Sequence, residues 1–86
     1  MQIAVYDTYV RRTDGLMMHF DILVPSTLKD QETILNFGRK YLASKGIDSK
    51  DFSTRECRFC HVESAPAEIE AVVNRDGYYI IEMENC

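Results

Sequence analysis

The segment QIAVYDTYVRRTDGLMMHFDILV, residues 2–24, carries the strongest structural signal in this chain. β-Branched and aromatic residues are frequent in both of its halves, which predicts two strands, over residues 2–11 and 16–24. Between them, Arg12-Thr13-Asp14-Gly15 is a typical hairpin turn. Pro25 follows and ends the second strand. The chain is therefore predicted to begin with an antiparallel β-hairpin.

The type of turn determines which side chains share a face of the hairpin. A two-residue loop at Asp14-Gly15 would place Asp7 on the same face as Phe20 and Ile22. A type I turn with Gly15 as a left-handed bulge residue shifts the register by one and reverses that choice. Thr-Asp-Gly suits the bulged turn, and burying a carboxylate among apolar groups costs on the order of several kcal/mol. We therefore predict the bulged register, in which one face is almost entirely apolar: Ala4, Tyr6, Thr8, Val10, Met18, Phe20, Ile22 and Val24.

The opposite face of the hairpin then gathers four polar side chains: Asp7, Tyr9, His19 and Asp21. Such a group can hold a metal ion or another polar ligand, which makes these four the candidate ligand-binding residues. Asp7, His19 and Asp21 are also a candidate acid–base site. The alternative is a solvated outer face, whose alternating polar residues simply keep the sheet soluble.

Apolar spacing and turn residues predict the remaining elements. A helix is expected where apolar residues recur at spacings of three and four up to Leu42, with Gly46 at its end. A third strand is expected over residues 55–62 and a fourth over residues 78–83. A second helix lies between them, with Ser64 as its cap and Pro66 in its first turn. Its predicted buried residues are Ile69, Val72 and Val73.

These elements predict a single α+β domain with the order β-β-α-β-α-β. The third strand, second helix and fourth strand are expected to form a right-handed parallel β-α-β crossover. The hairpin and this crossover would share one mixed sheet. Both helices are predicted to pack on one face of that sheet, because this is the simplest way to bury both apolar stripes.

The segment ECRFCH, residues 56–61, contains Cys-x-x-Cys-His, a pattern of haem attachment and of half a zinc site. On a strand, Cys57, Phe59 and His61 would point one way, and Arg58, Cys60 and Val62 the other. The two cysteine α-carbons then lie about 10 Å apart, too far for a disulfide. We predict no cofactor here, with zinc as the alternative. Structural zinc needs four ligands, and the candidate set is Cys57, Cys60, His61 and Cys86.

A reactive thiol is a further alternative for this segment. Cys60 and His61 are predicted to lie just before the second helix, whose N-terminus would lower the pKa of the thiol. The two residues can form a pair only if the strand ends before them. The preferred interpretation of the segment is simpler, with Cys57 and Phe59 as core residues.

Composition restricts the classes of partner. Ten basic and fourteen acidic residues give a net charge of −4, which argues against nucleic-acid binding. No apolar run approaches the roughly 20 residues of a membrane span, and no signal peptide is visible. Three cysteines suit a reducing cytoplasm. We expect a small cytoplasmic ligand-binding or protein-interaction domain without catalysis, able to form a homodimer through a strand edge.

Four blocks of sequence together resemble a known family: VYDTYV (residues 5–10), DG followed by MHFDILV (14–24), ECRFCH (56–61) and GYYIIEMENC (77–86). They resemble a small bacterial family catalogued as a domain of unknown function, number two thousand and twenty-four in that series. The resemblance covers nearly the whole chain. It implies a compact α+β domain in a stand-alone bacterial protein, and it implies no activity and no catalytic residues.

Overall fold

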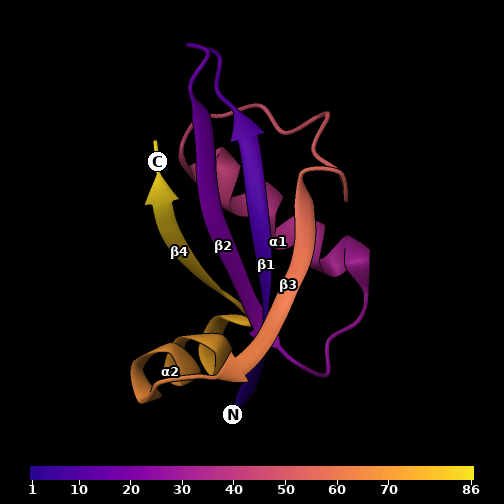
Figure 1. Ribbon diagram of the computed structural model, residues 1–86, viewed down its shortest axis with the longest axis vertical. Coiled ribbons are helices and arrows are strands. Elements are labelled where there is room, and N and C mark those ends of the chain that lie inside the picture. The colour runs from indigo at the N-terminus through magenta and orange to yellow at the C-terminus, as the bar shows by residue number, and fades with distance from the viewer.

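The computed structural model describes residues 1–86, which form four strands and two helices (Figure 1). The order β-β-α-β-α-β is the predicted one, and the predicted strands begin and end within two residues of the observed strands. The elements are β1 (Gln2–Arg11), β2 (Met17–Pro25), α1 (Gln31–Ser44), β3 (Cys57–Ser64), α2 (Ala67–Asp76) and β4 (Tyr79–Glu84).

The hairpin of β1 and β2 has the predicted bulged register. The Arg12 N–H donates to the Leu16 carbonyl at 2.7 Å, and the Gly15 N–H donates to the Arg12 carbonyl at 3.0 Å. Gly15 has a φ of +90°, which a residue without a Cβ adopts at little cost. Thr8 consequently lies opposite Phe20 on the apolar face.

The sheet is entirely antiparallel, which corrects the predicted mixed sheet. Its strand order is β3-β1-β2-β4, so β3 and β4 form opposite edges, and the predicted parallel crossover is wrong. Instead, α2 lies across one end of the sheet (Figure 1). A helix of 10 residues spans about 15 Å, and three strand spacings span about 14 Å. The helix is therefore long enough to carry the chain from one edge to the other.

The two helices do not share one face of the sheet, which corrects a second prediction. Ile34 and Leu42 of α1 pack in the main core with Phe20 and the other apolar-face residues of the hairpin. Ile69 of α2 packs against a smaller cluster on the opposite face, made of Ile3, Val5 and Leu23. These three residues were not predicted to be covered, because the alternation of the hairpin placed them on the outer face.

The C-terminal end of α1 agrees with its prediction, whereas the N-terminal end of α2 differs. Asp30 is the N-cap residue of α1, and Gly46 follows its end with a φ of +73°. In α2 the N-cap residue is Pro66. Ser64 instead ends β3, where its hydroxyl oxygen accepts a hydrogen bond from the Gln2 side chain. Neither helix has the length and apolar character needed to cross a membrane.

Candidate functional site

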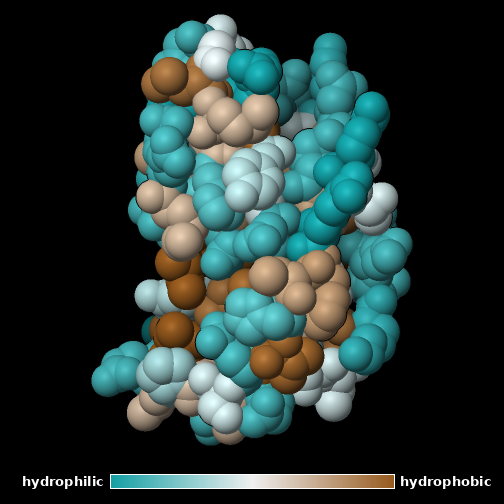
Figure 2. All heavy atoms as spheres, viewed as in Figure 1, coloured by the Kyte–Doolittle hydropathy of each residue, from teal (hydrophilic) through white to brown (hydrophobic).

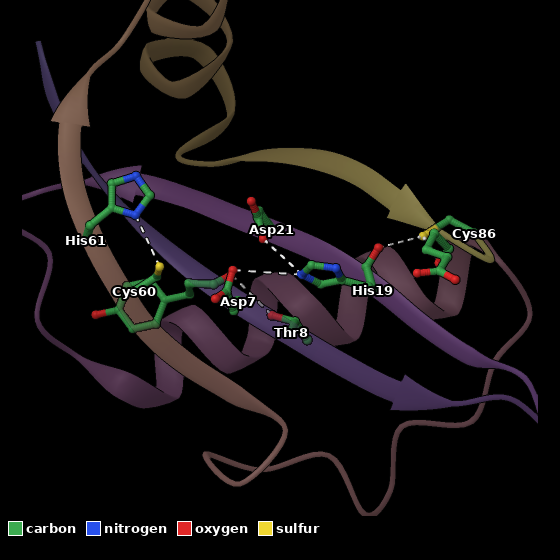
Figure 3. Close-up of polar contacts among 9 residues, drawn as sticks. Asp7, Thr8, His19, Asp21, Cys60, His61 and Cys86 are labelled. Atoms are coloured by element: carbon green, nitrogen blue, oxygen red, sulfur yellow. Dashed lines mark hydrogen bonds and ion pairs between the residues drawn. The ribbon is translucent and has the colours of Figure 1, made fainter.

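The predicted polar cluster lies in the middle of the outer face of the hairpin (Figure 3). Asp7 is directly opposite Asp21, and Tyr9 is directly opposite His19. The Nε2 atom of His19 lies 3.6 Å from Oδ1 of Asp21 and 3.8 Å from Oδ1 of Asp7. One donor atom from each of these three residues lies within 4.8 Å of the other two. The hairpin register thus brings together three potential metal ligands.

Two atoms of the cluster are buried without a partner. The side chains of His19 and Asp21 retain only 20% and 15% of their accessible surface. The Nε2 atom of His19 and Oδ1 of Asp21 are fully covered, and neither has a hydrogen-bond partner. The Tyr9 ring stacks on the His19 ring with centroids 4.2 Å apart and thereby fixes its orientation. Because buried polar atoms are normally hydrogen-bonded, these two atoms set the cluster apart from an ordinary solvated face.

The cluster changes the acidity of Asp21. Burial raises the pKa of Asp21 to about 6, and the neighbouring Asp7 carboxylate acts in the same direction. The charges of His19 and His61 partly oppose this increase. The Asp21 carboxyl group therefore gains and loses its proton close to neutral pH, well above the ordinary range for aspartate.

The surface around the cluster is divided between polar and apolar regions. Figure 2 shows mainly hydrophilic side chains over the upper part of the outer face, and apolar side chains toward the end where α2 lies. Val5 and Leu23 belong to that apolar end. Asp7 comes two residues after Val5, and Asp21 comes two residues before Leu23. The polar cluster therefore lies at the border of the cluster covered by α2.

A β-bulge in β3 brings Cys60 and His61 together. The pairing with β1 shifts by one residue, because His61 lies opposite Val5 whereas Phe59 lies opposite Tyr6. Cys60 is the additional residue, and the alternation of side chains changes there. The Nδ1 atom of His61 lies 3.2 Å from Sγ of Cys60. The two side chains form a pair within a continuous strand, which the sequence analysis did not anticipate.

The bulge also corrects the predicted facing of this segment. Cys57 and Phe59 pair with Thr8 and Tyr6 and point toward α1, whereas His61 is on the outer face. The predicted common face of Cys57, Phe59 and His61 is therefore wrong. The predicted common face of Arg58, Cys60 and Val62 is wrong too, because Val62 pairs with Ala4 on the α1 side. Cys57 is buried as predicted, whereas Phe59 is exposed. The sequence contains one sign of this change: the two large apolar residues of the strand, Phe59 and Val62, are three positions apart, and a regular strand would place them on opposite faces.

Cys60 does not have the environment of an activated thiol. Desolvation raises the pKa of Cys60, and so do the neighbouring Asp7 side chain and the negative charges of Asp21 and Glu63. β3 continues to Ser64, so Cys60 lies within the strand rather than beside the N-terminus of α2. The predicted decrease in thiol pKa is wrong, because carboxylates occupy the place where positive charge was expected.

The four candidate zinc ligands from the cysteine pattern do not converge. The segment is extended from Cys57 onward, as predicted. Cys57 is buried on the α1 side of the sheet, where desolvation raises its pKa. Cys60 and His61 are on the outer face of edge strand β3. Cys86 follows β4 at the other edge, and its thiol contacts the His19 carbonyl at 3.3 Å (Figure 3).

Comparisons with known proteins agree with the resemblance seen in the sequence. Residues 1–83 match the family described as "Domain of unknown function (DUF2024)". The structure is similar to the NMR structure of protein NE1680 from Nitrosomonas europaea, a structural genomics target, with 42% sequence identity and a TM-score of 0.86. That match covers 100% of this chain and 99% of the other. Comparison with curated proteins found no match. The chain therefore belongs to the DUF2024 family, whose function is unknown.

Proposed function

We propose that this protein is a small non-catalytic domain that binds a divalent metal ion between Asp7, His19 and Asp21. The convergence of three metal-ligating groups carries the proposal, since their donor atoms lie within 4.8 Å of one another. Two of these atoms, Nε2 of His19 and Oδ1 of Asp21, have no hydrogen-bond partner. A cation would supply both atoms with a partner and would offset the charge of the two carboxylates.

The donor set favours a borderline transition metal. One imidazole and two carboxylates suit ions such as Zn²⁺, Mn²⁺ or Fe²⁺. Ca²⁺ fits less well, because it takes about six to eight oxygen ligands. Tyr9 would hold the His19 ring in place, a role that neighbouring groups commonly perform for metal-bound histidines. With three protein ligands, Zn²⁺ would keep a coordination position for water or a small molecule.

Calorimetric titration of chelator-treated protein with Zn²⁺ and Co²⁺ tests the proposal, with elemental analysis after dialysis as a second readout. His19→Gln is expected to weaken Zn²⁺ binding at least about tenfold. His61→Gln is the matched control, because the chain has 2 histidines and His61 lies beside Glu63, outside the three-residue cluster. It should bind Zn²⁺ as the wild type does. No stoichiometric binding by the wild type, or a loss in His61→Gln but not in His19→Gln, would contradict the proposal.

Proton transfer by the same three residues is a second candidate, favoured by the acidity of Asp21. A carboxyl group with a pKa of about 6 beside an imidazole is suited to general acid–base chemistry. Carbon NMR of the Asp21 carboxyl group separates the two functions. If the carboxylate is a metal ligand, saturating Zn²⁺ moves its titration to lower pH. A titration that does not change in saturating Zn²⁺ favours proton transfer.

The same proposal includes a cytoplasmic location. All three cysteines are free thiols, which suits a reducing compartment. The net charge of −4 argues against a role in binding the phosphate backbone of nucleic acids. The expected partner is therefore a small ligand or another protein.

A further inference from the structure

β3 is an edge strand whose side chains are exposed. It pairs with β1 on one side only, and every residue after Cys57 is exposed. Phe59 and Val62 retain 56% and 46% of their accessible surface. An unpaired strand edge of this kind readily pairs with another strand.

The bulge at Cys60 gives the side chains of β3 an unusual symmetry. Phe59 and Val62 both pair with β1 residues that point toward α1, so they share that face although they are three positions apart. A regular strand would place them on opposite faces. Arg58 and Glu63 both pair with β1 residues of the outer face, so they share the other face.

The backbone of β3 has the same symmetry. Hydrogen bonds of 2.9 Å join the Glu56 carbonyl and the Ala65 N–H to the β1 side of the strand. In an antiparallel pair, successive residues direct their N–H and C=O groups alternately toward and away from the neighbouring strand. Glu56 and Ala65 direct these groups toward β1. Three residues after Glu56 and three residues before Ala65, the N–H and C=O groups of Phe59 and Val62 therefore point away from β1, toward the open edge. Both residues are thus able to pair with a further strand.

We propose that β3 pairs antiparallel with β3 of a second copy of this chain, around a two-fold axis at the bulge. In this register Phe59 lies opposite the partner's Val62, and Arg58 lies opposite the partner's Glu63. The two-fold axis repeats both pairs, which gives two apolar contacts and two ion pairs. In this register the paired residues direct their backbone groups compatibly, their side chains lie on the same face of the sheet, and the charged residues face opposite charges. The proposal does not depend on metal binding.

The surface beside β3 provides further apolar contact. A cavity of about 260 Å³ lies between β3 and α1, and its lining includes Ile34, Leu35 and Phe59. An added strand would place the partner's Val62 next to Phe59 on this side of the sheet. The partner's side chain would therefore lie against the apolar lining of the cavity.

The other edge of the sheet is not suited to self-pairing. β4 has the sequence YIIEME, with two glutamates and no basic residue. Glu82 is already engaged by the Tyr41 hydroxyl and by Lys45, at 2.7 Å from the latter. Pairing of two β4 strands would bring carboxylates together, whereas pairing of two β3 strands brings opposite charges together. The charges thus favour the β3 edge.

Sedimentation velocity over a range of concentrations tests this dimer. The wild type should show a monomer–dimer equilibrium. Arg58→Glu and Glu63→Arg each place like charges opposite one another twice, and each should raise the dimer dissociation constant at least about tenfold. The double variant R58E/E63R exchanges the charges and should restore dimerisation. Lys50→Glu changes the net charge as Arg58→Glu does, at an exposed loop position, and should behave as the wild type.

Three results would overturn the proposal. The first is a wild type that stays monomeric at the highest concentration reached. The second is a dimer that neither single variant weakens, since that dimer would use another surface. The third is a double variant that dimerises no better than the single variants, because the two residues would then not face each other. The three substituted side chains, Arg58, Glu63 and Lys50, are all exposed, so circular dichroism should show the same fold in each variant.

Discussion

Asp7 and Asp21 lie directly opposite each other across β1 and β2. Two carboxylates in this arrangement repel each other, and like charges in a cross-strand pair normally destabilise a sheet. The sheet tolerates the pair for two reasons. His19 lies within 4 Å of both carboxylates, and Asp21, with its pKa raised to about 6, can stay protonated in mildly acidic solution. Protonation and metal binding are therefore alternative ways to neutralise the same charge.

The first prediction concerns stability. The pKa of Asp21 is raised from 3.8 to about 6 in the folded protein. Between these values only the folded state keeps the proton, so the free energy of unfolding decreases as pH rises through this range. Asp21→Asn has no proton to lose in this pH range. Between about pH 4 and about pH 7.5, the free energy of unfolding of this variant should therefore rise relative to that of the wild type. The change should be on the order of 1 kcal/mol, allowing for solvent screening.

Urea denaturation of metal-free protein at the two pH values measures this difference. Asp51→Asn is the matched control, because Asp51 is exposed in the loop before β3, and this variant should follow the wild type. If Asp21→Asn shows the same pH dependence as the wild type, Asp21 does not carry the proton.

The second prediction concerns the pH dependence of metal binding. A metal ion and a proton compete for Asp21, so Zn²⁺ affinity should decrease as pH falls below about 6, by up to about tenfold per pH unit. Calorimetry at several pH values, in buffers of different ionisation enthalpy, measures both the affinity and the number of protons released. Affinity that is constant between about pH 7 and pH 5 would place the metal away from Asp21.

The third prediction concerns Gly38 of α1, which packs against Phe52 of the loop before β3. Glycine to alanine in a helix usually adds about 1 kcal/mol of stability. Here an added Cβ would lie 2.7 Å from the Phe52 ring and 3.2 Å from Ile22. Gly38→Ala should therefore destabilise the protein by about 1–3 kcal/mol in urea denaturation. Lys40→Ala, on the exposed side of the same helix, should change stability by less than about 0.5 kcal/mol.

The fourth prediction concerns the reactivity of Cys60. The Asp7 carboxylate contributes to the raised pKa of this thiol. Asp7→Asn removes that charge, so a larger thiolate fraction should increase the rate of iodoacetamide alkylation about threefold or more near neutral pH. Peptide mass spectrometry measures the rate at each cysteine, with exposed Cys86 as the internal control. An unchanged ratio of the Cys60 and Cys86 rates would show that Asp7 does not influence the thiol.

Local chemistry was sufficient to predict the hairpin and its polar cluster. Thr13-Asp14-Gly15 specifies the bulged turn, and the cost of burying Asp7 selects the same register. The facing of His19 and the other polar residues follows from that register alone, because side chains alternate along a strand. Turn type and alternation are properties of neighbouring residues, which a single sequence contains.

The rest depended on contacts between distant segments. β3 pairs with β1, a strand far from it in the sequence. Nothing in the sequence of α2 distinguishes a parallel crossover from a helix that lies across the end of the sheet. The bulge at Cys60 contains no glycine. It follows from the pairing of β3 with β1, whose register before Cys60 differs by one residue from the register after it. The environment of Cys60 could not be predicted without that fit, because it determines which carboxylates face the thiol.

The central place of the hairpin in the sheet has a consequence for the order of folding. Asp7, His19 and Asp21 all lie on the hairpin, so closing its short turn is enough to bring them together. β3 and β4, in contrast, join the sheet through contacts between distant parts of the chain. Short-range contacts form early in folding because they cost the least chain entropy. A cation bound by the hairpin would therefore act on the folding nucleus, and we expect it to accelerate folding more than it slows unfolding.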